Sequence, residues 1–112
     1  MRTALVTGTS TGLGHDVAST LVADGWEVIG SVRTQADSEQ LGDVPWEVVV
    51  ADMTDDAAVE ALGARAVERW GRLDALVNNA GIAMSGPFEE LSAAELRQSL
   101  DVNLVGPMVL AR

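Results

Sequence analysis

Short apolar runs alternate with longer stretches in which apolar residues recur at helical spacing. Four runs have the length of buried strands, and each ends at a glycine, a polar residue or an acid; they occupy residues 4–6, 28–32, 48–51 and 75–77. Because the runs are almost continuously apolar, we expect both faces of the resulting sheet to be covered. Strands that alternate with helices predict parallel pairing through right-handed crossovers.

The first and second of the intervening stretches predict helices that differ in strength. The first places Leu13, Val17 and Leu21 on one face at four-residue steps and ends at Gly25, a suitable left-handed cap. A short polar helix is expected over residues 37–41. The three tryptophans, Trp26, Trp46 and Trp70, border predicted elements and are expected to pack at the edge of the core.

Two further stretches carry clear helix-start signals. The third helix is predicted to begin with Thr54 as N-cap, with Asp55 and Asp56 in its first turn, and to end at Gly71. Its expected inward residues are Val59, Leu62, Ala66 and Trp70. The fourth is predicted from a capping box and a hydrophobic staple, formed by Ser92 with Glu95 and by Leu91 with Leu96.

Together these elements predict a single α/β domain over residues 1–112. We expect a Rossmann-like parallel sheet with helices on both faces, truncated after the fourth strand and the long helix that follows it. No repeat, linker or low-complexity stretch interrupts the pattern.

Composition narrows the classes of function. The net charge of −10 opposes broad association with nucleic acid or with an anionic membrane, so a small soluble ligand is favoured. The chain has no Cys, which excludes disulfides and thiolate catalysis, and its single His cannot build a metal site alone, so we expect no metal. We expect a cytoplasmic protein, because no signal peptide or membrane-length apolar segment is found.

A glycine-rich turn follows the first predicted strand. Gly8, Gly12 and Gly14 stand in the spacing G-x-x-x-G-x-G just before the first predicted helix. Glycines there allow a tight turn and a close backbone approach to a pyrophosphate, which the helix N-terminus then binds. The hydroxyls of Thr9, Ser10 and Thr11 could also donate to phosphate, although such residues are ordinary turn formers as well. The segment predicts dinucleotide binding.

At this point the chain resembles the short-chain dehydrogenase/reductase family, whose cofactor signature T-G-x-x-x-G-x-G matches residues 7–14. Two further segments match in order. Asp52 stands where the family's acid hydrogen-bonds the adenine ring, with Met53 beside it, and residues 78–81 match the N-N-A-G motif. Taken alone, Asp52 is more typical of an acid at a helix start, before Thr54.

A last matching segment, residues 101–103, corresponds to the region of the family's helical active-site Asn. The resemblance implies a catalytic role for Asn103 and cofactor contacts elsewhere. The implied cofactor-binding residues are Gly8, Thr9, Ser10, Thr11, Gly12, Leu13, Gly14, Arg33, Asp52, Met53, Asn79, Ala80, Gly81 and Val102.

The end of the second strand bears on the choice of cofactor. An acid there would bind the ribose 2′-hydroxyl of NAD, whereas Arg offers a planar charged fork for the 2′-phosphate of NADP. Val32 and Arg33 occupy this position. The sequence therefore favours NADP(H) over NAD(H), with a solvent-exposed Arg33 of no such role as the alternative.

The family's acid–base pair is Tyr-x-x-x-Lys, and this chain contains neither Tyr nor Lys. The resemblance implies the cofactor half of an NADP(H)-dependent oxidoreductase acting on a carbonyl or alcohol, inactive alone and a homo-oligomer when complete. Two alternatives stay open, a dinucleotide-binding module without catalysis and an inert remnant.

Overall fold

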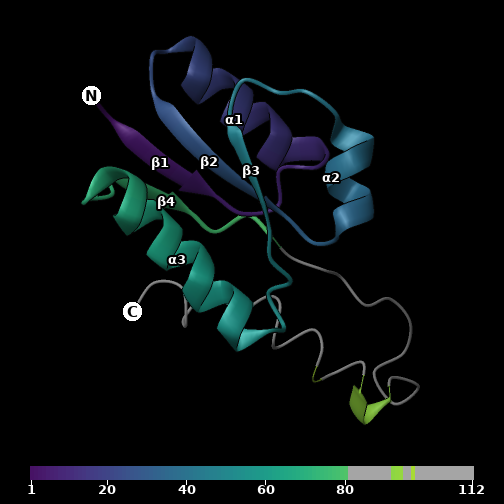
Figure 1. Cartoon of the computed structure of the whole chain (residues 1–112). Helices are drawn as coiled ribbons and strands as arrows, with labels where there is room; N and C mark the ends of the chain where they lie inside the picture. The colour runs from purple at the N-terminus through teal and green to yellow at the C-terminus, as the bar shows by residue number, and fades with distance from the viewer. Residues whose placement is uncertain (81–91, 95–96, 98–112) are drawn as a thin grey trace.

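The computed structural model describes residues 1–80, 92–94 and 97, and its sheet is formed within the first 80 residues (Figure 1). The elements follow one another as β1 (Thr3–Val6), α1 (Gly12–Ala23), β2 (Glu27–Val32), α2 (Gln35–Leu41), β3 (Glu47–Val50), α3 (Asp56–Trp70) and β4 (Ala75–Val77). The predicted strands are confirmed, with ends that differ by at most one residue.

All neighbouring strands pair in parallel, in the order β3-β2-β1-β4. The order reverses at β1, where Leu5 pairs with Ile29 of β2 on one side and with Leu76 of β4 on the other. In open α/β sheets the crevice outside the carboxyl ends of the strands at such a reversal is the usual ligand site.

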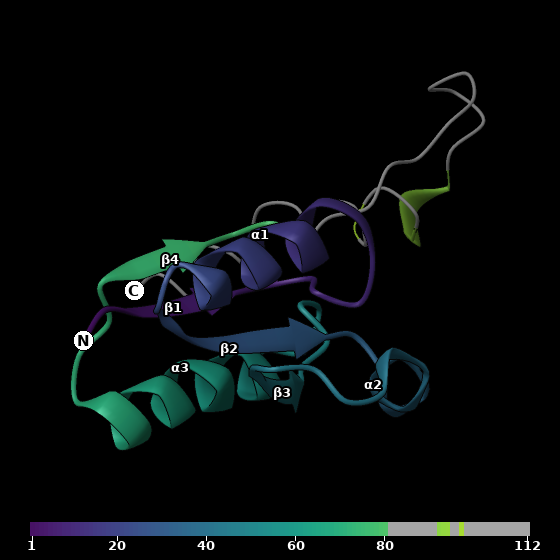
Figure 2. The ribbon, with the colours of Figure 1, turned by 90° about the horizontal axis from the view of Figure 1, so that it is seen from above.

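Helices cover both faces of the sheet, α1 on one side and α3 on the other (Figure 2). Alternate residues of β1 therefore enter two separate cores. The core on the α1 side is built from Ala4, Val6, Ala18, Val28 and Trp46. The core on the α3 side is built from Leu5, Ile29, Ala51, Leu62 and Ala66. Complete burial of a large aliphatic side chain such as Leu5 or Ile29 contributes about 1.5–3 kcal/mol.

The predicted inward face of the first helix is partly wrong. Leu13 is 69% exposed, whereas Gly14 and Ala18 are the buried residues of α1. Val17 and Leu21 flank this pair as half-buried neighbours of the core. The face nearest the sheet is made of the smallest side chains, because they allow the closest approach, and hydrophobic spacing alone does not locate them. The last residue of the helix is Ala23, and Gly25 follows in the predicted left-handed conformation, with a φ of +87°.

The predicted N-cap of the third helix is also wrong. Asp55, not Thr54, caps α3, and its carboxylate accepts a hydrogen bond from the backbone N–H of Ala58. Thr54 does not cap the helix, because both its N–H and its hydroxyl donate to Asp52. The helix ends at Gly71 as predicted, in the left-handed conformation. The second helix starts at Gln35 after the N-cap Thr34, two residues before the predicted start.

Ion pairs fasten α3 to two strands of the sheet. Arg65 makes two hydrogen bonds of 2.7 and 2.8 Å to the carboxylate of Glu47, and Arg69 adds a third of 3.1 Å. The Trp70 indole N–H donates to Glu27 at 2.8 Å. The Arg65 hydrogen bonds, helped by the charges of both arginines, hold the pKa of Glu47 below its ordinary value despite partial burial. The predicted position at the core edge is confirmed for Trp26 and Trp70, whereas Trp46 is buried within the core.

Part of the sequence prediction lies outside the described residues. Ala93, Ala94 and Arg97 are helical and exposed, within the stretch predicted as the fourth helix. Glu95, Leu91 and Leu96 of its predicted start are not among the described positions. Within the described residues no helix has the length and apolar character required to cross a membrane.

Candidate functional site: a cleft at the carboxyl ends of the strands

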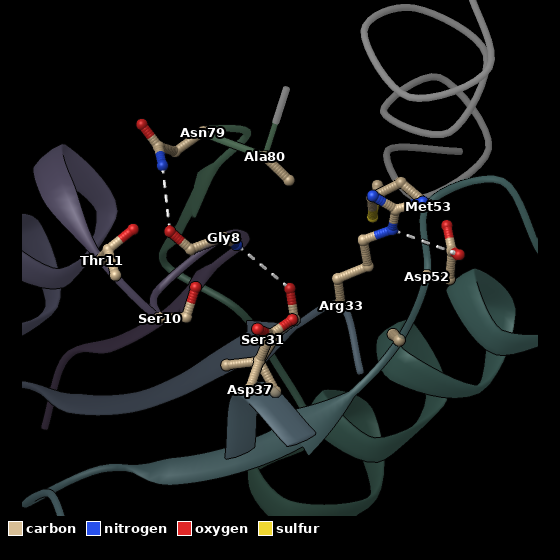
Figure 3. A pocket seen from close by; sticks show the side chains of 12 residues that line it. Gly8, Ser10, Thr11, Ser31, Arg33, Asp37, Asp52, Met53, Asn79 and Ala80 are labelled. Carbon is tan, nitrogen blue, oxygen red and sulfur yellow. Dashed lines mark hydrogen bonds and ion pairs between the residues drawn. The ribbon is translucent and has the colours of Figure 1, made fainter. Parts of the chain in front are cut away.

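A cleft of about 290 Å³ opens where the strand order reverses, at the carboxyl ends of the strands (Figure 3). We call it the strand-end cleft. It is lined by Gly8, Ser10, Thr11, Ser31, Val32, Arg33, Asp37, Ala51, Asp52, Met53, Asn79 and Ala80. These residues come from the loop after β1, the ends of β2, β3 and β4, and the first turn of α2.

The loop after β1 is fastened to the end of β4 by a buried hydroxyl. Thr7 Oγ1 accepts hydrogen bonds of 3.0 Å from the backbone N–H groups of both Asn79 and Ala80, and donates to the Val77 carbonyl. In return, Asn79 Nδ2 donates to the Gly8 carbonyl at 3.1 Å. These bonds satisfy the backbone groups at the strand end and fix Asn79 and Ala80 against the loop.

The same loop is fastened to the end of β2 through Ser31. The backbone N–H of Thr9 donates to the Ser31 carbonyl at 2.9 Å, and the Gly8 N–H donates to Ser31 Oγ at 3.3 Å. Thr9 Oγ1 also donates to the Ser31 carbonyl, and the Thr9 side chain is completely buried. The Thr9 hydroxyl therefore lies away from the cleft, contrary to its expected role as a phosphate donor.

Two glycines are required by this tight arrangement. Gly8 has a φ of +73°, and a Cβ there would lie 2.9 Å from the Ala80 Cα. A Cβ at Gly14 would overlap the Gly8 carbonyl oxygen. A side chain at either position would push the loop away from the sheet or from α1.

The start of α1 lacks a side-chain cap. Thr11 is its N-cap, but the Thr11 side chain makes no capping hydrogen bond, and the first turn contains no acid. The first backbone N–H groups of a helix have no partner within the helix and carry a partial positive charge. Gly12 and Leu13 contribute such groups beside Ser10 and Thr11, whose hydroxyls line the cleft. This arrangement suits an anion.

On the other side of the cleft, Arg33 faces Asp52. Their closest charged atoms, Arg33 Nε and Asp52 Oδ2, are 3.6 Å apart (Figure 3). Partial burial raises the pKa of Asp52, but the two hydrogen bonds from Thr54 and the charge of Arg33 outweigh it, so the pKa lies below its ordinary value. Asp52 is therefore ionised at neutral pH and offers acceptor oxygens beside the buried Met53.

The structure thus brings most of the predicted site residues together. Those that line the strand-end cleft are Gly8, Ser10, Thr11, Arg33, Asp52, Met53, Asn79 and Ala80. Gly12, Leu13 and Gly14 lie in the first turn of α1. Gly81, Val102 and Asn103 are outside the described residues, so their predicted roles stay predictions.

Four residues that line the cleft were not among the predicted site residues, although Val32 had been placed beside Arg33 at the position that bears on cofactor choice. They are Ser31, Val32, Asp37 and Ala51. Ser31, Val32 and Ala51 stand at or just after strand ends, a position that already indicated neighbours of the site. Asp37 had a separate signal, the spacing Thr34-x-x-Asp37, which places an acid in a first helical turn next to the end of β2.

Comparison with known proteins agrees with this geometry. A family model described as short chain dehydrogenase matches residues 2–112. The NADPH-dependent 3-dehydrocapnine reductase of Ornithobacterium rhinotracheale is 37% identical over an alignment that covers 100% of the chain and 41% of that protein. The chain thus spans less than half of this relative's length.

Two solved structures share the fold and were determined with a dinucleotide. A short chain dehydrogenase from Burkholderia cenocepacia in complex with NADP superposes with a TM-score of 0.87 and 32% identity, over 98% of this chain and 48% of that one. The 3-ketoacyl-(acyl-carrier-protein) reductase of Brucella melitensis, complexed with NADH, gives a TM-score of 0.89 and 30% identity, over 99% of this chain and 48% of that one. The Gly-rich loop, the strand order and these matches show that the chain belongs to the short chain dehydrogenase family.

Proposed function

We propose that these residues form the cofactor-binding part of an NADP(H)-dependent oxidoreductase that acts on a carbonyl or alcohol substrate. The observation that carries the proposal is the uncapped start of α1 beside a strand-end cleft that also contains Arg33 and Asp52. One side of the cleft offers unpaired donors to an anion, and the other offers a cation and an acceptor. These are the groups that a phosphorylated dinucleotide needs.

The residues present fit such a cofactor. The backbone N–H groups of Gly12 and Leu13, with the hydroxyls of Ser10 and Thr11, would hold the pyrophosphate. Asp52 would accept a hydrogen bond from the adenine amino group, with Met53 beside it. Asn79 and Ala80 keep the loop and the end of β4 together. We also assign Gly81 a contact with the cofactor, as the family resemblance implies.

Arg33 supports the preference for NADP(H). It stands directly after β2 and lines the cleft, where its guanidinium would pair with a 2′-phosphate. The matched relatives support a nicotinamide dinucleotide of either kind, since one is named NADPH-dependent and one structure contains NADH. The preference for the phosphorylated form therefore rests on Arg33.

When bound, the nicotinamide supplies or accepts the hydride. The chain contains no Tyr or Lys, so we propose that the acid–base pair lies outside these 112 residues and that they are inactive alone. We assign Asn103 a catalytic role and Val102 a cofactor contact, as the family resemblance implies. We also propose a cytoplasmic homo-oligomer as the complete form.

The proposal is tested by titrating NADP and NAD separately into the protein of native length. We expect tighter binding of NADP, and an Arg33→Ala variant should weaken NADP binding by about 10- to 100-fold, the usual contribution of a charge-assisted hydrogen bond, with little change for NAD. Arg2→Ala is the matched control, because Arg2 pairs with Asp24 far from the cleft. Equal affinity for the two dinucleotides would contradict the NADP preference, and binding of neither would contradict the proposed function.

Activity gives a second test. The 112-residue chain alone should bind the dinucleotide but should not convert any carbonyl or alcohol. The protein of native length should convert such a substrate with the same cofactor. Turnover by the isolated chain would show that it contains its own acid–base group.

A further inference from the structure

Asp37 places a carboxylate in the cleft close to where the proposed 2′-phosphate contact lies. It belongs to the first turn of α2, four positions after Arg33, and its side chain is half-buried. Asp37 lines the strand-end cleft together with Ser10 and Arg33 (Figure 3). A second hollow, lined by Ser10, Thr11, Asp37, Gln40 and Leu41, continues the cleft past Asp37 toward α2.

The local charge balance is unfavourable for an additional dianion. The described lining of the strand-end cleft contains one guanidinium, Arg33, and two carboxylates, Asp37 and Asp52. Arg33 already pairs with Asp52 at 3.6 Å. Asp37 is not part of that pair, and its carboxylate instead accepts a 2.9 Å hydrogen bond from the Thr34 hydroxyl. The Thr34 hydroxyl is neutral, and no described cation pairs with Asp37, so the start of α2 alone offsets its negative charge.

We infer that Asp37 is a specificity-determining residue that opposes the 2′-phosphate and so limits the discrimination between NADP and NAD. The inference rests on the proposed function, in which the dinucleotide occupies this cleft. Arg33 attracts the phosphate and Asp37 repels it, so the measured preference is the difference between two opposed electrostatic effects. NAD shares the pyrophosphate but lacks the 2′-phosphate, so the repulsion by Asp37 should be larger for NADP than for NAD.

Removal of the Asp37 charge leaves the local structure largely in place. The backbone N–H of Asp37 donates to Thr34 Oγ1 at 3.1 Å, and Asn at this position keeps that bond as well as a side-chain acceptor for Thr34. Asp37→Asn therefore isolates the charge. Glu39→Gln is the matched control, since it removes an equal charge from an exposed position on the same helix that does not line the cleft.

The test measures dissociation constants for NADP and NAD with the protein of native length and its variants. Asp37→Asn should tighten NADP binding by about three- to tenfold at low ionic strength, as expected for the removal of a like charge from a solvated cleft, and should change NAD binding clearly less. The gain should shrink as salt is added. Asp37→Glu, which keeps the charge, should retain the original ratio of affinities, and Glu39→Gln should change it little.

The outcomes separate this inference from the proposed function. Equal changes for NADP and NAD in Asp37→Asn, or a gain matched by Glu39→Gln, would overturn the role of Asp37 while leaving the cofactor site intact. Binding of neither dinucleotide by the unsubstituted protein would overturn both. Tighter NADP binding by Asp37→Asn in a protein that nevertheless prefers NAD would support the role of Asp37 and contradict only the NADP preference.

Discussion

The first turns of α1 and α3 both have backbone N–H groups without a partner inside the helix. These groups are capped by a side chain at α3 but not at α1. At α3, Asp55 caps the helix and Asp56 adds a negative charge to the first turn. At α1, Thr11 makes no capping bond and the first turn has no acid. A cap contributes about 0.5–2 kcal/mol, so α1 gives up stability that α3 gains.

The difference corresponds to position in the fold. The uncapped start of α1 lies beside the strand-end cleft, whereas the capped start of α3 lies after Asp52, past the end of β3. A helix start whose donors are already paired has little left to offer a ligand. The comparison indicates that the uncapped N–H groups of α1 are available to bind a ligand, whereas the cap at α3 stabilises its helix.

The largest expected effect comes from Gly14→Ala, which breaks the α1 side of the comparison. The added methyl group would overlap the Gly8 carbonyl oxygen, so the loop or α1 must shift. We expect a loss of about 1–3 kcal/mol or more in unfolding free energy and the loss of measurable dinucleotide binding. Denaturant unfolding and cofactor titration measure the two effects.

Gly71→Ala is the control for Gly14→Ala at the other helix. Gly71, unlike Gly14, has a positive φ, +71°, and a Cβ there meets no atom within 4 Å. It should destabilise the protein by about 1–2 kcal/mol through backbone strain and leave dinucleotide affinity unchanged. If Gly14→Ala bound the cofactor as well as Gly71→Ala does, the close approach of loop and helix would not matter for binding.

Thr11→Asp should move stability and binding in opposite directions. The new carboxylate can cap α1 and favourably meet the positive end of the helix, which should raise the unfolding free energy by about 0.5–1 kcal/mol. The same charge faces the proposed pyrophosphate, so dinucleotide affinity should fall about tenfold or more, the sensitivity expected of a charged group in direct contact. Unchanged affinity would mean that the anion does not bind at this helix start.

Removal of the cap at α3 should affect stability alone. Asp55→Ala is expected to lower the unfolding free energy by about 1 kcal/mol, whereas Thr11→Ala should lower it by a few tenths at most because no capping bond is lost. Thermal unfolding of the two variants gives the comparison directly. A larger loss for Thr11→Ala would contradict the assignment of α1 as uncapped.

Local sequence patterns predicted the elements of the fold, but they could not predict details that depend on contacts between elements. The succession of strands and helices along the chain through β4, and the glycine loop between β1 and α1, follow from local patterns, and they were confirmed. The N-cap of α3 was misplaced by one residue because Thr54 and Asp55 both suit the position, and only the capture of Thr54 by Asp52 decides between them. These hydrogen bonds depend on the position of Asp52, which is set by the end of β3 at Val50.

The site was predicted in outline for a similar reason. Motifs located the residues that touch the cleft from β1, β3 and β4, while Ser31 and Asp37 enter it only because β2 lies beside β1 and α2 folds back after it. Thr9 shows the converse case. Its hydroxyl stands in the motif but turns to the Ser31 carbonyl, a partner 22 residues away that no local pattern indicates.

The smallest expected effect concerns pH and the ion pairs that fasten α3. Hydrogen bonds from Arg65 hold the pKa of Glu47 below its ordinary value of 4.5, so the folded protein binds this proton less readily than the unfolded chain. The contribution of Glu47 to the free energy of unfolding is therefore complete above pH 4.5 and is lost as pH falls through the lowered pKa.

Glu47→Gln should reduce the free energy of unfolding by about 1 kcal/mol or less at neutral pH, because both partners are partly exposed. The gap between the two proteins should close as unfolding is measured at lower pH, while the exposed control Glu39→Gln follows the unsubstituted protein. If the difference in unfolding free energy between the unsubstituted protein and Glu47→Gln stayed constant with pH, Glu47 would stabilise α3 through packing rather than through its charge. That result would contradict the role of the ion pairs.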